Sequence, residues 1–134
     1  MPGYVLDSYA MLAYFRKEAG GEIVEKILLE AAAGKHELFM ACINAGEIFY
    51  MAYRKDGADK AALVWKALQQ FPIKITDADL QFTHKAAYIK ARYSLSFADA
   101  FAAALAINKK AVLLTGDTEF NNLINEAGFK VKYL

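Results

Sequence analysis

One stretch of the sequence decides the fold: residues 94–120, which read SLSFADAFAAALAINKKAVLLTGDTEF. After Asp99, its first half consists almost entirely of Ala, Phe, Leu and Ile, which is typical of a buried helix. Its second half is a short apolar run that ends at Thr115 and predicts a buried strand. Gly116 and Asp117 follow this strand directly. In open α/β sheets ligands bind beyond the carboxyl ends of the strands, where helix N-termini also point. Asp99 and Asp117 are therefore both candidate site residues.

The rest of the chain continues this alternation of helices and strands. Short apolar runs predict further strands at residues 4–6, 38–41, 73–75 and 130–133. Apolar residues at helical spacing, bounded by caps, glycines and Pro72, predict helices at about residues 8–18, 23–34, 44–55, 58–70, 76–93 and 118–127. Strands separated by helices indicate a parallel sheet covered on both faces. The sequence has no internal repeat or linker, so we expect one domain over residues 1–134.

Composition excludes several classes of protein. With 57% apolar residues and a net charge of +1, the chain has the balance of a compact domain and no overall attraction to nucleic acid or acidic membranes. Cys42 is the only cysteine, which excludes an internal disulfide and a cysteine-based zinc site. No apolar run approaches the roughly 20 residues needed to span a bilayer, and the N-terminus does not resemble a signal peptide. We therefore expect a cytoplasmic protein.

The helix that follows Asp99 carries two different faces. Ala102, Ala103 and Ala106 share its row and form a small-residue face, which would let another backbone element come close. High helix propensity is an equally good explanation of these alanines. We expect the bulkier face to point into the core, and it comprises Phe97, Phe101 and Leu105.

A glutamate occupies an unexpected position in the helix predicted at residues 44–55. Glu47 lies in one i, i+4 row with Ile43 and Met51, so it is expected in the apolar stripe rather than on the solvent face. A carboxylate buried among such residues must be paired, protonated or bound to a metal ion. Glu47 is therefore a stronger functional candidate than an ordinary helix-surface acid.

Four acids occupy suggestive positions, and each aspartate has a structural explanation as well as a functional one. Asp7 and Asp117 follow strands and could cap the next helix, while Ser96 and Asp99 resemble a capping box. If the strands before Asp7 and Asp117 are central, however, both aspartates lie at the same edge of the sheet. The helix N-terminus that carries Asp99 can point to that edge too.

Convergence of these acids would create an electrostatic conflict. Carboxylates that share a site repel one another and raise each other's pKa values. A divalent cation removes the conflict, and oxygen-only ligands favour Mg²⁺ or Mn²⁺ over zinc. Such ions polarise phosphodiesters and lower the pKa of a bound water. The pattern therefore suggests metal-dependent phosphodiester hydrolysis.

Four segments of the chain resemble a known family, the PIN-domain ribonucleases, and more narrowly the VapC toxins of type II toxin–antitoxin systems. The resemblance covers essentially the whole chain, in order and spacing, and is carried by VLDSYAMLA at 5–13, INAGEIFY at 43–50, LSFADAFAAALA at 95–106 and LTGDTEF at 114–120. It implies a Rossmann-like three-layer α/β/α sandwich with a five-stranded parallel sheet. It further implies a Mg²⁺- or Mn²⁺-dependent endoribonuclease whose target is structured RNA, usually tRNA or rRNA.

The resemblance also assigns roles to individual residues. Asp7 and Asp99 would be the principal metal ligands, while Glu47 and Asp117 would complete the acidic cluster and position the attacking water. A VapB-type antitoxin would thread a segment across the cleft, and dimers are usual in the family. Cys42 departs from the small serine expected at its place, which hardly affects the chemistry. Two hydroxyl side chains would support the acids by hydrogen bonds: Ser8 and Thr115.

Basic pairs end the two helices that carry Ser8 and Glu47. These charges suit the negative ends of helix dipoles, which is their structural explanation. Contact with an RNA backbone is the alternative, and tyrosines on the same helices could stack on bases. The candidate RNA-binding residues are Arg16, Lys17, Arg54 and Lys55.

Competing functions on a similar fold are less consistent with the motifs. A haloacid-dehalogenase-type phosphatase requires a second aspartate two residues after Asp7, where this chain has Tyr9. A phospho-receiver module requires paired acids after the first strand and a lysine after a late strand, and neither is present. The alternative from another class is a PIN fold that binds RNA or protein without cutting.

Overall fold

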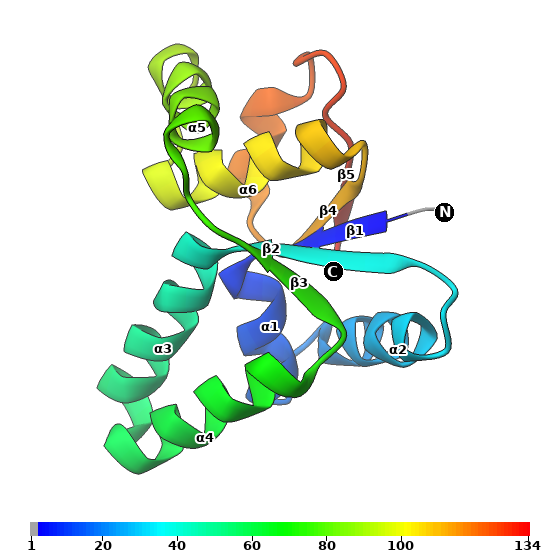
Figure 1. Cartoon of the computed structure of the whole chain (residues 1–134), viewed down its shortest axis with the longest axis vertical. Coiled ribbons are helices and arrows are strands. Elements are labelled where there is room, and N and C mark those ends of the chain that lie inside the picture. The colour runs from blue at the N-terminus through cyan, green and yellow to red at the C-terminus, as the bar shows by residue number, and fades with distance from the viewer. Residues whose placement is uncertain (1–2) are drawn as a thin grey trace.

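The computed structural model describes residues 3–134, and its centre is a parallel five-stranded sheet (Figure 1). Strand order is β3-β2-β1-β4-β5, and every neighbouring pair is parallel. This confirms the predicted sheet. The strands are β1 (Gly3–Leu6), β2 (Glu37–Ala41), β3 (Ile73–Thr76), β4 (Val112–Thr115) and β5 (Val131–Tyr133).

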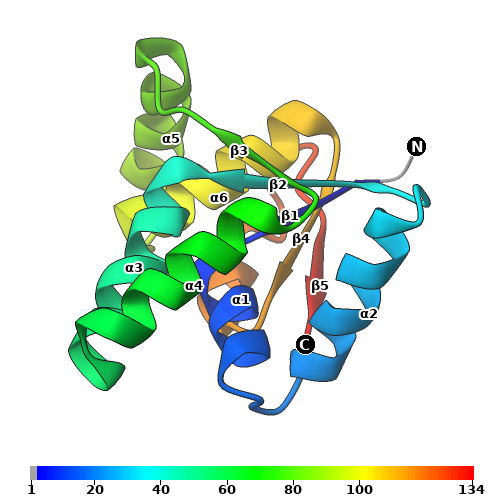
Figure 2. The same cartoon turned by 60° about the horizontal axis from the view of Figure 1, so that its bottom comes forward.

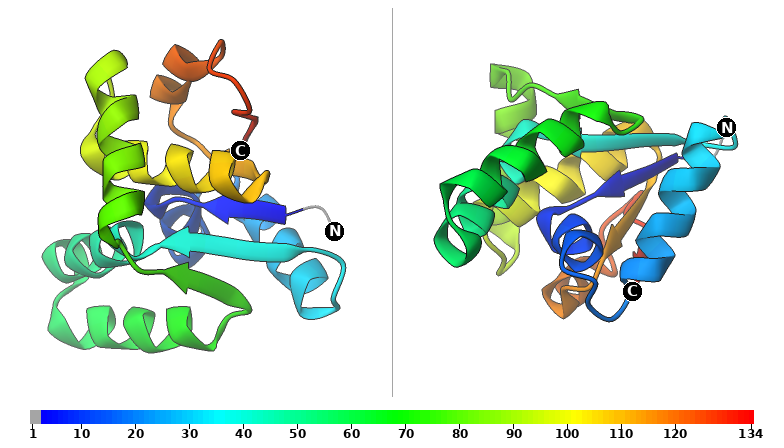
Figure 3. Two further views of the ribbon diagram at one scale, coloured as in Figure 1. Left: turned by 45° about the horizontal axis from the view of Figure 1, so that its top comes forward. Right: turned by 90° about the horizontal axis from the view of Figure 1, so that it is seen from below.

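Helices cover both faces of the sheet, as expected for an α/β/α sandwich (Figures 2 and 3). One layer contains α1 (Ser8–Phe15), α2 (Gly21–Ala32), α3 (Cys42–Asp56) and α4 (Ala58–Gln70). The other contains α5 (Leu80–Arg92), α6 (Phe97–Lys109) and the 3₁₀ helix η1 (Thr118–Leu123). No helix among residues 3–134 is long and apolar enough to cross a membrane.

Both faces of the central strands are buried, which explains their continuous apolar sequences. Successive side chains on a strand point to opposite faces. Val5 therefore packs in the core beneath α5 and α6, whereas Leu6 packs in the core beneath α1–α4. Leu113 and Leu114 on β4 divide between the two cores in the same way.

The helices that follow β1 and β4 lie on opposite faces of the sheet, and this arrangement positions the site. Connections from β1 through β3 run over the face covered by α1–α4, whereas α6 and η1 flank β4 on the opposite face. Because the segments that leave β1 and β4 diverge to opposite faces, a crevice opens beyond the carboxyl ends of these strands. Asp7 follows β1 and Asp117 follows β4, so both aspartates border the crevice.

The small-residue face of α6 lies in the core, where it allows the close approach to another backbone element that was one of its two explanations. Ala102, Ala103 and Ala106 are all fully buried, and α6 lies close to β1 and β2. The prediction for Phe97 is wrong, because this first residue of α6 is 42% exposed and contacts Phe101 from the surface side.

The predicted helix at residues 118–127 is wrong beyond Leu123, where η1 ends and turns follow to Gly128. Side chains in this segment bind neighbouring elements instead of forming a helical face. Asn122 donates a hydrogen bond to the Ser94 carbonyl, and Glu126 pairs with Arg92.

Two other helix boundaries also differ from the prediction. The first helix ends at Phe15 rather than near residue 18, because Lys17 adopts a left-handed conformation with φ of 53°. The helix expected from residue 76 begins at Leu80, since Asp79 caps it by accepting a hydrogen bond from the Phe82 N–H.

Two helical glycines provide a test of the packing between α1 and α2. A Cβ added to Gly21 would lie 2.7 Å from the Ala13 carbonyl oxygen, a backbone atom that cannot rotate away, whereas a Cβ on Gly46 meets nothing within 4 Å. We expect Gly21→Ala to lower the free energy of unfolding by about 1–3 kcal/mol, as overpacking does. The matched Gly46→Ala change should raise it by about 0.5–1 kcal/mol. Urea denaturation measures both, and equal effects would contradict this account of the helix contact.

Candidate active site

A cleft of about 520 Å³ lies beyond the carboxyl ends of β1 and β4 and contains all four predicted acids. The acids come from four separate segments of the chain, which the fold brings together. A fifth acid, which the sequence analysis did not single out, joins them. These five acids are Asp7, Glu47, Asp99, Asp117 and Glu119, and the exposed Glu18 also lines the cleft.

Asp7 caps α1 and also lines the cleft, so its structural role as a cap is compatible with a place in the site. Its Oδ1 accepts a hydrogen bond from the Ala10 N–H at 2.9 Å and thereby caps α1. Its Oδ2 accepts one from the Thr115 hydroxyl at 2.5 Å. The residue is only 1% exposed, and this burial raises the pKa of Asp7 to about 7, with further contributions from the charges of Asp99 and Asp117.

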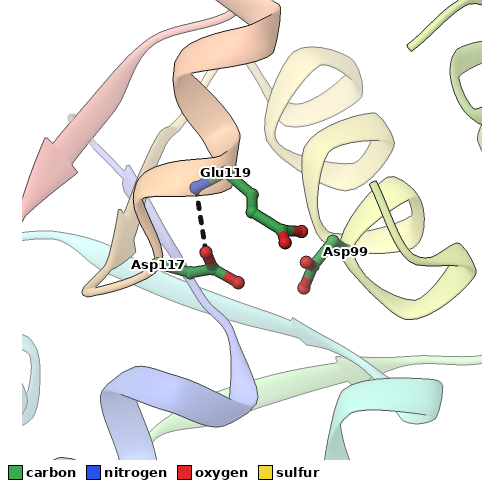
Figure 4. A group of neighbouring side chains, drawn as sticks. All are labelled: Asp99, Asp117 and Glu119. Atoms are coloured by element: carbon green, nitrogen blue, oxygen red, sulfur yellow. Dashed lines mark hydrogen bonds between the residues drawn. The ribbon is translucent and has the colours of Figure 1, made fainter. Parts of the chain in front are cut away.

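Asp99 points into the same cleft from the first turn of α6 (Figure 4). Ser96 caps this helix by accepting a hydrogen bond from the Asp99 N–H at 3.1 Å, and the Asp99 carboxylate faces the other acids. Partial burial and then the charge of Asp117 raise the pKa of Asp99 to about 7. The expected mutual repulsion is therefore present, but burial is the larger cause.

Asp117, which precedes η1, and Glu119, in the first turn of η1, face Asp99 (Figure 4). Asp117 Oδ1 accepts a hydrogen bond from the Glu119 N–H at 2.9 Å, which fixes the turn and caps η1. One carboxylate oxygen from each of the three acids lies within 4.8 Å of the others. Glu119 was missed by sequence reasoning, although its position two residues after Asp117 in a post-strand turn was a usable signal.

Thr115 connects the aspartates that follow the two central strands. Its hydroxyl donates to Asp7 and accepts a hydrogen bond from the Asp117 N–H at 3.0 Å. The side chain is fully buried at the end of β4. One hydroxyl therefore fixes the relative positions of two acidic segments.

Glu47 is half-buried at the boundary of α3, and its expected place in the apolar stripe is wrong. Its row neighbour Ile43 is 37% exposed, because the buried stripe contains Ala45, Ile48 and Ala52 instead. The carboxylate is nevertheless hydrogen-bonded. Glu47 Oε1 accepts hydrogen bonds from Ser8 Oγ at 3.0 Å and from Asn44 Nδ2 at 3.1 Å.

Asn44 is a second residue of the site that sequence reasoning missed. It is fully buried, and its Nδ2 donates both to Glu47 and, at 3.3 Å, to the Ala98 carbonyl oxygen at the start of α6. The amide thus connects the helix that carries Glu47 to the helix that carries Asp99. An asparagine one turn before Glu47 was the available signal.

Of the four basic residues predicted to contact RNA, the structure places only Arg16 at the cleft. Lys17, Arg54 and Lys55 are exposed and do not line it. The Arg54 guanidinium instead lies over the Tyr50 ring, 5.0 Å from the ring centre.

The donor set of the cleft fits a hard divalent cation. Asp99, Asp117 and Glu119 offer only carboxylate oxygens, the ligands that Mg²⁺ and Mn²⁺ prefer. The raised pKa values of Asp7 and Asp99 show that a negative charge is disfavoured there without a cation. Asp99, Asp117 and Glu119 could hold the ion, with Asp7 beside them in the cleft.

The raised pKa values predict how stability depends on pH. The carboxyls of Asp7 and Asp99 titrate near 4 in the unfolded chain and near 7 in the metal-free folded protein. The folded protein therefore binds more protons in this window, so its free energy of unfolding should fall as pH rises from 5 to 8. Urea titrations in EDTA measure this slope, which Asp7→Asn should reduce. Asp59→Asn, an exposed acid elsewhere, should leave it unchanged; an equal reduction would contradict the assignment.

Comparisons with known proteins agree with this fold. The family model described as PIN domain matches residues 4–125. No curated protein matches the chain in sequence. Similar solved structures include VapBC2 from Rickettsia felis bound to promoter DNA (TM-score 0.75, 14% identity, 98% of each chain covered). They also include DNA-bound VapBC from Salmonella typhimurium (0.75, 18%, 99% of this chain and 98% of that chain) and Mycobacterium tuberculosis VapC20, a sarcin-ricin loop cleaving toxin (0.72, 15%, 88% and 92%). Since the family model covers most of the sequence, the protein belongs to the PIN domain family.

Proposed function

We propose that the protein is a Mg²⁺- or Mn²⁺-dependent endoribonuclease of the VapC type that cleaves structured RNA, tRNA or rRNA, in the cytoplasm. The observation that carries this proposal is the convergence of five carboxylates from four chain segments in one cleft. Uncompensated negative charge of this density has no use in a structural core. It is the arrangement that a metal-dependent phosphodiesterase requires.

In this proposal four acids would hold the metal ion, and Glu47 would act on the attacking water. Asp99, Asp117 and Glu119, whose oxygens lie within 4.8 Å of one another, would hold the ion together with Asp7. Such an ion supplies Lewis-acid polarisation of the phosphodiester and activation of water. Asp7 also fixes the acidic loop, because its carboxylate accepts the Thr115 hydroxyl that in turn accepts the Asp117 N–H.

Glu47 would act as the residue that orients the attacking water and accepts its proton. It stands outside the tight group of three acids, and Ser8 and Asn44 hold its Oε1 in place. Both bonds go to one oxygen, so Oε2 has no hydrogen-bond partner among residues 3–134. A carboxylate with one anchored and one available oxygen is suited to general-base catalysis.

The similar solved structures support a protein partner and an RNA target. Several are complexes of a VapC with its VapB, and VapC20 is described as cleaving the sarcin-ricin loop. We extend both properties to this chain as part of the proposal: inhibition by a VapB-type antitoxin, rRNA or tRNA as substrate, and a homodimeric state. A PIN fold that binds RNA or protein without cutting is the alternative, and the acids of the cleft argue against it.

Cleavage of total RNA by purified, partner-free protein is the decisive experiment. Reactions contain Mg²⁺, Mn²⁺ or EDTA, and an Asp99→Asn variant serves as the control. Discrete fragments that require the metal and disappear in the variant would establish the activity, and mapping their ends would identify the cleaved bond. RNA that stays intact with both metals would overturn the proposal in favour of the binding module.

Substitution of Glu47 tests its role separately. Glu47→Gln keeps the hydrogen bonds from Ser8 and Asn44 possible but cannot accept a proton, so we expect a loss of about 10²–10⁴-fold in cleavage rate with unchanged stability. Glu18→Gln removes the same charge from the rim of the same cleft and is the matched control. Equal losses in the two variants would mean that total charge, rather than a positioned base, determines the rate.

A further inference from the structure

One wall of the cleft is formed by one face of α1 and its C-cap residue, Arg16. Tyr9, Leu12 and Arg16 recur at i, i+3 and i+7, the spacing of one helix face, and all three line the cleft beside the acids. Leu12 is buried at the base of the cleft lining, whereas Tyr9 is 50% exposed. The wall therefore presents an aromatic ring at one end, a cation at the other and an apolar surface between them.

The Tyr9 ring lies against the loop that carries the acids. A Cβ added to Gly116 would lie within 2.7 Å of three ring atoms of Tyr9, so the ring lies directly over the backbone between Thr115 and Asp117. Gly116 is required here by this close approach and not by its backbone angle. The loop holds one side of the ring in place, while half of the side chain stays open to solvent.

Among the described residues 3–134, Arg16 is the one cation that lines the acidic cleft. Neither of the two ion pairs among residues 3–134 involves Arg16, so its charge is available to a ligand. The chain turns away directly after it, because Lys17 is left-handed and fully outside the cleft lining. Tyr9 and Arg16 are separated by seven residues, which is about 10 Å along a helix axis.

We propose that this face of α1, which we call the α1 wall, is the substrate-binding wall of the site. An unpaired base next to the scissile phosphate stacks on Tyr9, and Arg16 binds a backbone phosphate farther along the same strand. This inference rests on the proposed function and specifies the substrate as a single-stranded or looped RNA segment, since a base within a duplex cannot reach an aromatic side chain. An exposed aromatic ring followed by a cation on one wall is the arrangement that binds single strands.

Binding measurements separate the two contacts. The probe is a fluorescein-labelled random-sequence RNA decamer with Mg²⁺, and all proteins carry Asp99→Asn so that no cleavage occurs. Tyr9→Ala should weaken binding roughly 5- to 150-fold, the equivalent of 1–3 kcal/mol per stacked base, while Tyr9→Phe should bind like the parent. Arg16→Ala should reduce the slope of log K against log salt by about 0.7, and Lys55→Ala, an exposed cation outside the cleft, should not.

Gly116→Ala provides an independent test of the ring position. The added methyl group would displace the Tyr9 ring, so the change should weaken RNA binding when Tyr9 is present. It should have no further effect in a Tyr9→Ala background, because the three atoms nearest the new Cβ all belong to the Tyr9 ring. Additive losses would show that Gly116 acts through the loop and would overturn the assignment of Tyr9.

Cleavage by the protein without Asp99→Asn keeps this inference distinct from the proposed function. Metal-dependent cleavage with RNA affinity that is unaffected by Tyr9→Ala and Arg16→Ala would overturn the α1 wall and leave the ribonuclease in place. That result would indicate that a protein partner, rather than RNA, binds the α1 wall. Affinity that depends on both residues without any cleavage would uphold the wall and overturn the nuclease.

Discussion

The whole site depends on one buried interaction, the hydrogen bond between the Thr115 hydroxyl and the Asp7 carboxylate. It joins residues 108 positions apart at the ends of two neighbouring central strands, where the chain changes from one face of the sheet to the other. A buried carboxylate is costly unless it is hydrogen-bonded. The threonine satisfies this requirement and also accepts the N–H of Asp117, so a single hydroxyl sets the spacing of the acidic loop.

The fold could be predicted from the sequence because its signals are local and mutually consistent. Buried parallel strands read as short apolar runs, as at Leu113 and Leu114, and capping residues such as Asp7 mark where helices begin. The segment after Thr118 was the exception. Its residues have some helix propensity, but Ile124 is 72% exposed and Asn122 and Glu126 bind other elements, so tertiary contacts determine its form.

The site could be predicted only in part, because periodicity gives the side of a helix but not its exact rotation against its neighbours. Glu47 shows this limit: a small rotation of α3 moves it from the apolar stripe to the boundary and brings Asn44 into the interior. Glu119 shows a second limit of prediction from sequence, because its approach to Asp99 depends on how the loop after β4 turns. The convergence of Asp7 and Asp117 was predictable because parallel strands end at a common edge. Asp99 could be added because the helix N-terminus that carries it can point to that edge.

The position of β1 in the middle of the sheet has a consequence for how this protein is made. Its two neighbours, β2 and β4, lie about 30 and 110 residues further along the chain, so the pairings that close the crevice have high contact order. During synthesis from the N-terminus, β1 and β2 can pair while β4 has not yet been made. A nascent chain therefore contains Asp7 and Glu47 without the loop that faces them, and the complete acidic cleft forms only in the last steps of folding.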